Sequence, residues 1–213
     1  MKKIYCISGL GADEGAFSRL IIIGHQLIYI PWLLPEKKES ISAYAKRMSV
    51  VITDENPIIM GLSFGGMMAI EISKFLPVKK IIIISSITSK NELPAWMKRV
   101  AILKLNKLFT MRSHKVLEPI QNRLLGVSKN SAEIEMVRNY RKYAPILYTT
   151  WAVNEVVNWR NDFKHPSLFH IHGDNDNMFP IKKLFPTYVV KGGGHFMIMN
   201  KAAEVSTYIN SIL

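Results

Sequence analysis

The chain has 213 residues, of which 48% are hydrophobic and 21% charged, and its 28 Lys and Arg residues against 16 acids give a formal net charge of +12. This length suits one domain with an ordinary core, since such a domain buries roughly 70% of its unfolded surface, and the hydrophobic fraction excludes a disordered basic tail. The single cysteine, Cys6, excludes an intramolecular disulfide and a zinc finger, and we expect it to be a small buried apolar residue.

The sequence contains no stretch of about 18 uninterrupted apolar residues, the length that a membrane-spanning helix requires. The longest uncharged stretch, residues 20–35, is interrupted by Gly24, His25 and two prolines. We therefore expect a soluble, cytoplasmic protein without a transmembrane segment. The positive charge by itself leaves nucleic acid, an acidic membrane surface and an anionic small molecule as partner classes.

Short apolar runs rich in β-branched residues recur along the chain and are separated by segments long enough for helices. Runs that are apolar on both faces are typical of parallel strands covered on both sides. The pattern predicts an α/β fold with about six mostly parallel strands and helices on both faces. The predicted strands are residues 4–7, 27–30, 58–60, 81–84, 168–171 and 188–190, and the helices between the early strands are residues 14–23, 40–53 and 63–75.

One long interval, from residue 90 to residue 163, contains helical patterns and no convincing strand. Two helices are predicted at residues 92–109 and 114–125. A third begins after Asn130, where Glu133 completes a capping box, and a fourth begins at Pro145. The interval is several times longer than an ordinary connection between strands. We therefore predict a helical cap at residues 89–163, inserted into a core formed by residues 1–88 and 164–213.

The strongest local signal for chemistry is the segment Gly61-Leu62-Ser63-Phe64-Gly65, which follows a predicted strand and precedes a predicted helix. A nucleophile on a sharp strand-to-helix turn needs small residues two positions before and after it, because the backbone crowds there. The alternative interpretation is a glycine-rich turn in which the serine caps the helix. The strand before the motif and the helix after it favour the nucleophile.

A serine hydroxyl is a poor nucleophile near neutral pH, so this hypothesis requires a histidine base and an orienting carboxylate. Asp176 lies in an acidic turn after the fifth predicted strand, and His195 lies in a glycine-rich loop after the sixth. The chain order serine, acid, histidine differs from the orders of the chymotrypsin and subtilisin types.

In these motifs the chain resembles the α/β-hydrolase superfamily. The resemblance rests on the serine motif, on His172-Gly173-x-x-Asp176, on Gly194-His195-Phe196, and on Ile7-Ser8-Gly9-Leu10-Gly11 after the first strand. It covers residues 1–88 and 160–213, and the predicted insertion stands where family members carry a variable cap over the active site. The resemblance implies the α/β-hydrolase fold.

The resemblance also assigns roles to individual residues. Ser63 would be the nucleophile, His195 the general base and then acid, and Asp176 the orienting carboxylate, while the backbone N–H groups of Leu10 and Phe64 would form the oxyanion hole.

Two features depart from the family pattern. Ser8-Gly9 stands where the family often has His-Gly, and because the donors belong to the backbone we expect the oxyanion hole to survive. The chain also starts on the strand that carries this loop, so we expect the sheet to lack the family's first two strands.

Two alternatives concern the residues around the acid. Asp174 competes with Asp176, although the family spacing favours Asp176 and Asp174 is the better candidate for a turn-forming residue. The pattern His170-x-His172-x-Asp174 resembles part of a metal site, but a metallo-hydrolase of that kind would need a histidine at position 175, where Asn175 stands. We therefore predict no metal and no cofactor, and interpret the two histidines as strand-end residues.

The charge is concentrated in one part of the chain. Residues 90–143 hold twelve Lys and Arg residues against four acids, which is a net +8 of the total +12. This charge suits the solvated outer face of amphipathic helices, or a surface that attracts an anionic substrate such as an acyl thioester of a phosphorylated carrier or an anionic lipid. No recognition motif accompanies it, so nucleic-acid binding is disfavoured.

The sequence thus predicts a serine hydrolase of the carboxylesterase or thioesterase type that acts on a small-molecule acyl ester or thioester. Two alternatives use the same residues: a hydrolase-like ligand-binding protein or receptor with little turnover, and a C–C bond hydrolase or lyase.

Overall fold

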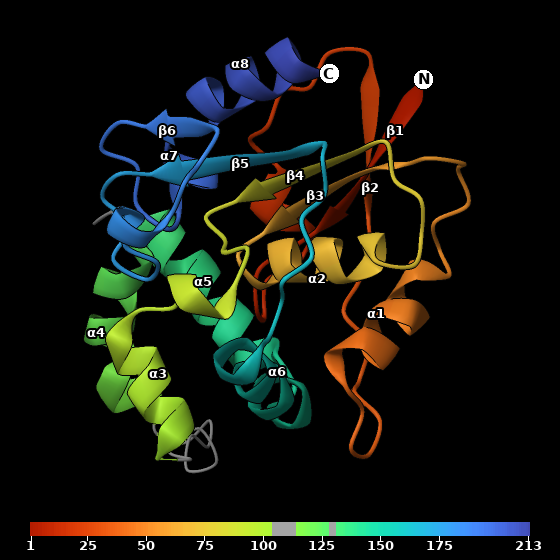
Figure 1. The fold of residues 1–213 in the computed structure, drawn as a ribbon. Helices are drawn as coiled ribbons and strands as arrows, with labels where there is room; N and C mark the ends of the chain where they lie inside the picture. Colours follow the sequence, from red (N-terminus) through yellow and green to blue (C-terminus); the bar gives the residue numbers. More distant parts are fainter. Residues whose placement is uncertain (104–113, 128–130) are drawn as a thin grey trace.

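The computed structural model describes residues 1–103, 114–127 and 131–213 of the chain. A six-stranded sheet runs through the molecule (Figure 1). Its strands are β1 (Lys2–Ile7), β2 (His25–Tyr29), β3 (Ile58–Leu62), β4 (Lys80–Ile84), β5 (Leu168–Gly173) and β6 (Tyr188–Val190). The six predicted strands are therefore confirmed.

The order of the strands in the sheet is β2-β1-β3-β4-β5-β6, and all neighbours are parallel. From β1 the chain moves outward to β2 and then returns to form β3 on the other side of β1. The loops after β1 and β3 consequently leave the sheet in opposite directions. Parallel sheets bind their ligands in the crevice at such a point, and here it is flanked by the loop containing Gly9 and by Ser63.

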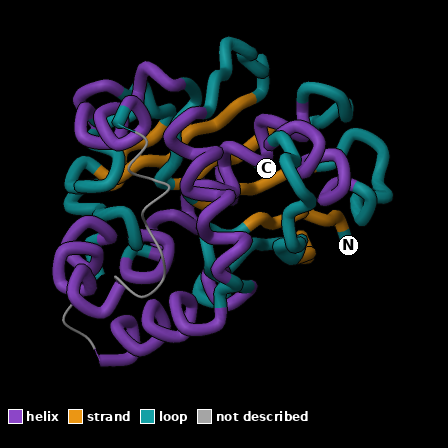
Figure 2. Tube along the Cα trace, turned by 90° about the horizontal axis from the view of Figure 1, so that it is seen from below, coloured by secondary structure: helices purple, strands orange, loops and turns teal. Residues whose placement is uncertain are grey.

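Helices cover both faces of the sheet, as Figures 1 and 2 show. Helices α1 and α2 pack on one face, and the 3-10 helix η1 packs with α7 and α8 on the other. Their bounds are α1 (Ile41–Ser49), α2 (Phe64–Ser73), η1 (Glu14–Phe17), α7 (Met197–Asn200) and α8 (Ala202–Ile212).

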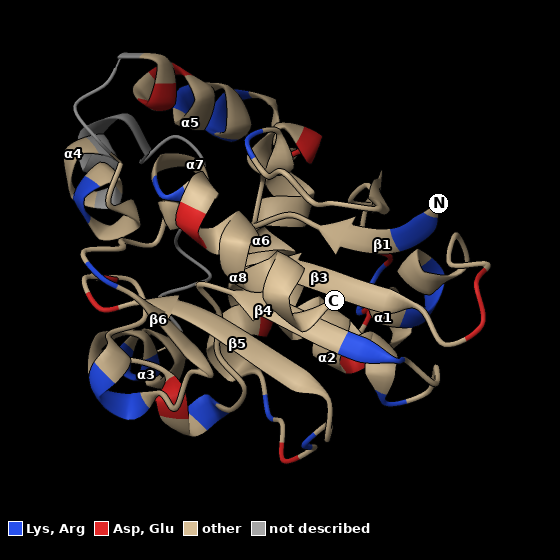
Figure 3. Ribbon diagram, turned by 90° about the horizontal axis from the view of Figure 1, so that it is seen from above, with Lys and Arg blue, Asp and Glu red and all other residues tan. Residues whose placement is uncertain are grey.

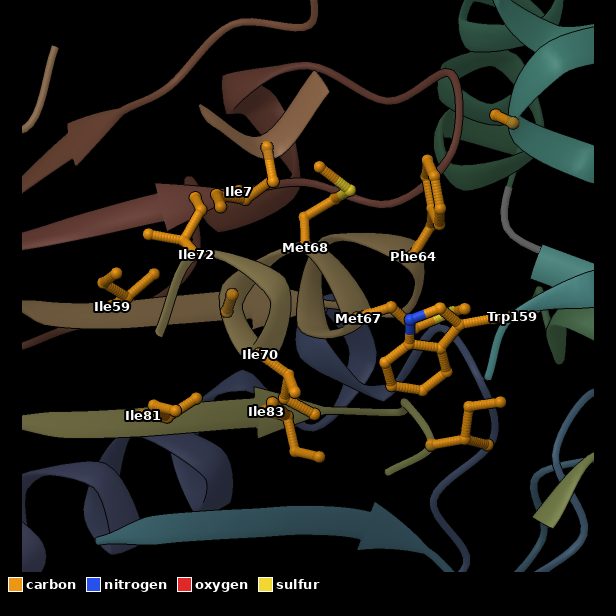
Figure 4. Packing of buried hydrophobic residues seen from close by; sticks show 14 of the residues in the cluster. Ile7, Ile59, Phe64, Met67, Met68, Ile70, Ile72, Ile81, Ile83 and Trp159 are labelled. Carbon is orange, nitrogen blue, oxygen red and sulfur yellow. The ribbon is translucent and has the colours of Figure 1, made fainter. Parts of the chain in front are cut away.

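The strands contribute alternate side chains to two cores. On the face covered by α2, Ile59, Ile81 and Ile83 pack against helix residues that include Met67 and Ile70 (Figure 4). The intervening strand residues, such as Ile58 and Ile82, pack with α7 and α8. Burial on both faces explains why the strands are continuous apolar runs, and it gives the loops at the strand ends a rigid base.

The predicted helical insertion is confirmed between β4 and β5. After a 3-10 turn, η2 (Lys90–Glu92), it comprises α3 (Ala95–Ile102), α4 (His114–Leu125), α5 (Ser131–Tyr143) and α6 (Ile146–Asn158). Residues 104–109 of the helix predicted at residues 92–109, and Asn130 of the predicted capping box, lie outside the described residues. No described helix is both long and apolar enough to cross a membrane.

The predicted helix at residues 14–23 is wrong, because only the 3-10 helix η1 forms there. Beyond η1 the backbone is held by side chains of α8: the Ile21 N–H donates to Ser206 Oγ and the Ile23 N–H donates to Asn210 Oδ1. These bonds take the place of helical ones, so tertiary partners overrule the local pattern. The other two early helices are confirmed with shorter ends.

Candidate active site

Ser63 lies between the end of β3 and the start of α2, in a backbone conformation that L-residues rarely adopt. Its φ is 52° and its ψ is −116°. Such a conformation costs of the order of 1–3 kcal/mol and persists only where the surroundings impose it. Here the Ser63 N–H donates to the Ile84 carbonyl at 2.8 Å, while the Ser63 carbonyl accepts from the Gly66 N–H at 2.9 Å and from Ser86 Oγ at 2.7 Å.

The glycines on either side of Ser63 are required by space. A Cβ atom on Gly61 would lie 2.2 Å from the Gly65 carbonyl oxygen, and one on Gly65 would lie 2.1 Å from the Ile7 carbonyl oxygen. The turn therefore brings β3, α2 and the end of β1 into backbone contact. This explains the sequence spacing in physical terms and leaves Ser63 at the carboxyl end of the sheet.

The structure brings together the three residues of the predicted triad. Ser63 Oγ lies 2.9 Å from His195 Nε2, and His195 Nδ1 lies 2.8 Å from Asp176 Oδ2. Because an ionised carboxylate only accepts, Nδ1 carries the proton and donates to Asp176, which leaves Nε2 free to accept from the serine hydroxyl. His195 and Asp176 are buried, whereas Ser63 is partly exposed.

The Asp176 carboxylate is held in place by two backbone groups in its own turn. Its Oδ1 accepts from the Met178 N–H at 2.7 Å and from the Phe179 N–H at 2.9 Å. Burial acts to raise the pKa of Asp176, but His195, His172 and the Phe179 N–H favour the charged form and hold the pKa below its usual value. The carboxylate is therefore ionised at neutral pH.

The competing acid, Asp174, has a different partner. Its Oδ1 accepts from the Gly192 N–H at 2.7 Å, which ties the turn after β5 to the loop after β6. Its side chain is exposed, whereas that of Asp176 is buried against His195. The geometry thus favours Asp176 as the partner of the histidine and gives Asp174 a turn-forming contact.

The two backbone N–H groups expected to bind an oxyanion flank Ser63. Phe64 follows it directly, and Leu10 follows Gly9, on which a Cβ would lie 3.6 Å from Ser63 Cβ. Within the described ranges, neither the Leu10 nor the Phe64 N–H donates a hydrogen bond. Unpaired backbone donors beside a nucleophile provide what an oxyanion hole requires.

Trp32, which sequence analysis did not identify, contacts the peptide that carries the Leu10 N–H and the side chain of Phe64. Its Nε1–H donates to Ser8 Oγ at 2.9 Å and to the Gly9 carbonyl at 3.2 Å, and its ring stacks on Phe64 with a centroid distance of 5.2 Å. The Gly9 carbonyl and the Leu10 N–H belong to one planar peptide, so holding the oxygen also sets the direction of the N–H. The only sequence signal is the position of Trp32 shortly after a strand that neighbours β1.

Comparisons with known proteins find no match by sequence and many by structure. No family model matches the sequence, and no curated protein matches it. The esterase EaEST from Exiguobacterium antarcticum has a TM-score of 0.74 at 12% identity, over 100% of this chain and 92% of the esterase. A bromoperoxidase from Bacillus anthracis has a TM-score of 0.71 at 14% identity, over 99% of this chain and 91% of that one.

A third structure, the N-acyl homoserine lactonase AidH in complex with N-hexanoyl homoserine lactone, has a TM-score of 0.69 at 15% identity and covers 99% of this chain and 89% of the lactonase. The matches cover nearly all of this chain and about nine-tenths of each of the other three. The chain has the α/β-hydrolase fold. Identities this low establish the fold alone, so the chemistry is argued from the residues.

In this α/β-hydrolase fold the insertion contacts the loops at the carboxyl ends of the strands. The Phe196 N–H, next to His195, donates to the Leu125 carbonyl of α4 at 2.8 Å, and a Cβ on Gly11 would lie 3.3 Å from Ala144 Cβ. On α6, Tyr148 packs on Trp32 with a centroid distance of 5.3 Å. The insertion therefore borders the site that Ser63 occupies.

Two further histidines, His170 and His172, lie behind the triad on β5. Their rings meet with Nε2 of His170 3.2 Å from Nδ1 of His172. The metal interpretation of these residues gains no support from the geometry, since no cluster of three or more His, Cys, Asp or Glu side chains suited to a metal ion occurs among the described residues.

Basic side chains are spread over the described helices of the insertion, as Figure 3 shows for α3, α4 and α5, whereas the sheet is largely uncharged. Lys98 and Arg99 lie on α3, Arg123 on α4, and Arg138, Arg141 and Lys142 on α5. These six basic side chains belong to the insertion, the element that borders the site.

Proposed function

We propose that this protein is a serine hydrolase that cleaves a carboxylic ester or thioester through an acyl-enzyme intermediate. The observation that carries the proposal is the unbroken hydrogen-bonded relay from Ser63 Oγ through the His195 imidazole to the Asp176 carboxylate, with distances of 2.9 and 2.8 Å. A strained serine, a correctly oriented histidine and an ionised carboxylate are the parts that nucleophilic catalysis by serine requires.

In the first half-reaction, Ser63 Oγ attacks the substrate carbonyl carbon while His195 Nε2 takes the hydroxyl proton. Asp176 stabilises the resulting imidazolium through the Nδ1 hydrogen bond. The negative charge that develops on the carbonyl oxygen is accepted by the N–H groups of Leu10 and Phe64. The bond to the leaving alcohol or thiol then breaks, and the leaving group takes the proton from Nε2.

In the second half-reaction, His195 takes a proton from a water molecule, and the resulting hydroxide attacks the acyl carbon. The bond to Ser63 Oγ breaks, the carboxylic acid leaves, and the serine recovers its proton from His195. The substrate, water and these residues supply every proton and electron pair in this scheme, so it requires no metal or cofactor.

The site and the structural neighbours support this choice of substrate class. Two of these are named as an esterase and a lactonase, and both names denote cleavage of an ester bond. Helices α3, α4 and α5 carry basic side chains and belong to the insertion that borders the site, so a small acyl ester or thioester with an anionic group suits the charge of this region.

The test is a panel of p-nitrophenyl esters and acyl thioesters of graded chain length, neutral and anionic, assayed with the wild type and with Ser63→Ala. We expect wild-type turnover and a loss approaching 10⁶-fold in kcat for the variant, as for a serine protease that loses its nucleophile. A fluorophosphonate probe should label the wild type at Ser63 and leave the variant unlabelled.

Two outcomes would contradict the proposal. A wild type that neither labels nor exceeds Ser63→Ala on any substrate would point instead to a ligand-binding protein with this fold. Labelling without turnover of esters, together with cleavage of a C–C bond in a β-diketone, would assign the same residues to a different reaction.

A further inference from the structure

The proposed function leaves unused a pair of buried histidines at the end of β5. His170 and His172 are 3% and 0% exposed, and as alternate residues of one strand they point to the same side. Burying two imidazoles without a role in folding or chemistry is costly, because each ring has two polar atoms that must find partners.

The partners of His172 fix the position of its proton. Its Nε2 lies 2.8 Å from the Phe179 carbonyl, which can only accept, so Nε2 carries the proton. In a neutral ring Nδ1 is then an acceptor, and His170 Nε2, 3.2 Å away, must donate to it. The Phe179 carbonyl therefore fixes the tautomer of His172, which in turn requires a donor at His170 Nε2. A backbone hydrogen bond with Ser86 is a further contact of His170.

Both rings are neutral at neutral pH, as this arrangement requires. Burial, aided by the neighbouring imidazole of His172, lowers the pKa of His170 to about 3. Burial also lowers the pKa of His172, while the opposing attraction of Asp176 is weaker. The ionisable groups that act on the pair are Asp176 and His195, in addition to the two rings themselves.

The pair is connected to the triad through Phe179. The carbonyl of Phe179 accepts from His172, its N–H donates to Asp176 Oδ1 at 2.9 Å, and its ring packs edge-on against His195 with a centroid distance of 5.4 Å. The same Nε2–H of His172 lies 3.4 Å from Asp176 Oδ2, the oxygen that holds His195. A change at His172 is thus transmitted to both the acid and the base.

We propose that His172 is a positioning residue of the triad and holds the Asp176 turn against β5 through its hydrogen bond to the Phe179 carbonyl. His170 donates to Nδ1 of His172 and so keeps the His172 proton on Nε2. The inference deepens the proposed function and rests on it. Loss of the His172 donor would free the Phe179 peptide and let the carboxylate shift relative to His195. Misplacement of a catalytic group by about 1 Å can cost about 100-fold in rate.

A matched pair of substitutions separates positioning from mere packing. His172→Gln places an amide N–H near the position of Nε2 and keeps a donor for Phe179, whereas His172→Asn, also a polar amide, places its N–H near Nδ1 and cannot reach. We expect His172→Gln to keep kcat within about threefold of wild type and His172→Asn to lose about 10- to 100-fold, with KM changed by less than about twofold in both.

A double-mutant cycle shows whether the effect passes through the carboxylate. In an Asp176→Asn background, His172→Asn should cost less than about threefold in kcat, because the group that it positions is already gone. Equal losses for His172→Gln and His172→Asn, or the full loss by His172→Asn in the Asp176→Asn background, would overturn the inference and leave His172 with a packing role.

A spectroscopic measurement keeps this test separate from the proposed function. The Nδ1 proton of His195, donated to Asp176, should give a far-downfield proton NMR signal that survives in His172→Gln and is lost or broadened in His172→Asn. An intact signal in His172→Asn would contradict the inference. Equal inactivity of wild type and Ser63→Ala on every substrate would contradict only the proposed function, and the NMR signal would still test the inference.

Discussion

At the scale of single residues, Trp32 contacts the Gly9–Leu10 peptide and the side chain of Phe64, beside the two N–H groups that we propose to stabilise the oxyanion. Its indole N–H bonds the Gly9 carbonyl and its ring stacks on Phe64. The Ala12 N–H also donates to the Gly9 carbonyl, at 3.0 Å, so the orientation of this peptide rests on two donors. Removal of one donor should loosen the direction of the Leu10 N–H without abolishing it.

Trp32→Phe should therefore lower kcat by about fivefold and leave KM nearly unchanged. The new ring can still stack on Phe64, while the bond to the Gly9 carbonyl is lost, and a net contribution of about 1 kcal/mol corresponds to a factor of roughly 3 to 10. Steady-state kinetics on the best ester of the panel measure the effect.

The control for this variant is Trp151→Phe, in the same aromatic cluster. Trp151 packs on Tyr44 and Phe64, and its Nε1–H donates to the Glu39 carbonyl, away from the Gly9 peptide. Its substitution should affect stability and leave kcat intact. If both variants lose kcat equally, Trp32 acts through general packing of the cluster and not through the Gly9 peptide.

At the scale of elements, the contact among β3, α2 and the end of β1 depends on glycine. A Cβ on Gly65 would lie 2.1 and 2.4 Å from the carbonyl oxygens of Ile7 and Ser8, and backbone atoms of a central strand cannot move aside as a flexible side chain could. Either α2 must shift away from β1 or the turn at Ser63 must open. Both changes would displace Ser63.

Gly65→Ala should consequently destabilise the fold by about 3 kcal/mol or more, which is a fall of roughly 6 to 12 °C in Tm for a chain of this size. Labelling of Ser63 by a fluorophosphonate should also slow strongly. Differential scanning calorimetry and probe-labelling rates measure the two effects.

The matched control is Gly24→Ala. Gly24 has a φ of 71°, but a Cβ there would meet nothing within 4 Å. Only the backbone strain of about 1 kcal/mol therefore applies, and we expect Tm to fall by roughly 2 to 4 °C with the labelling rate unchanged. A Gly65→Ala protein as stable and as readily labelled as Gly24→Ala would contradict the steric explanation of the motif.

The elements that could be predicted from the sequence are those whose residue pattern is imposed by burial or by backbone contact. The strands are buried on both faces and so are continuous apolar runs, and Gly61 and Gly65 are imposed by backbone contact. The helix predicted at residues 14–23 is too long, because the backbone of Ile21 and Ile23 is bonded by Ser206 and Asn210, about 185 residues away.

At the scale of the whole molecule, the candidate site is assembled by the topology. Ser63, Asp176 and His195 could be predicted because each stands in a motif and the fold brings strand ends together. Trp32 and the link from His172 through Phe179 could not be predicted, because their partners are backbone carbonyl groups. Every residue has such a group, so a sequence pattern does not indicate which one a side chain contacts. Contacts to backbone are therefore where the structure adds most to the sequence.

The buried histidines also determine how the whole fold responds to acid. The pKa of His170 is about 3 in the native state, against about 6.5 in an unfolded chain, so between these values the unfolded chain binds a proton that the native state does not. The free energy of unfolding then falls as the pH falls, by roughly 1 kcal/mol per pH unit, beginning near pH 6.5. The lowered pKa of His172 acts in the same direction.

Carboxylates with lowered pKa values, Asp176, Glu39 and Asp54, add to this loss only at lower pH, because an unfolded carboxylate takes up its proton near pH 4. Between pH 7 and pH 5 the histidines dominate. We therefore expect the free energy of unfolding, measured by urea titration, to fall by about 2 kcal/mol or more over this range.

His170→Gln should flatten this decline, since it removes one group that protonates only on unfolding and keeps an amide that can donate to His172. We expect a lower stability than that of the wild type at pH 7, and the change in unfolding free energy between pH 7 and pH 5 should shrink by roughly half or more. His165→Gln, in the loop before β5 where the ring is only half-buried, is the control and should keep the wild-type dependence of the unfolding free energy on pH.

An unchanged decline in His170→Gln would mean that the buried His170 ring is not the group that couples folding to protons in this range. The net positive charge of the chain would then be the better explanation of the acid sensitivity.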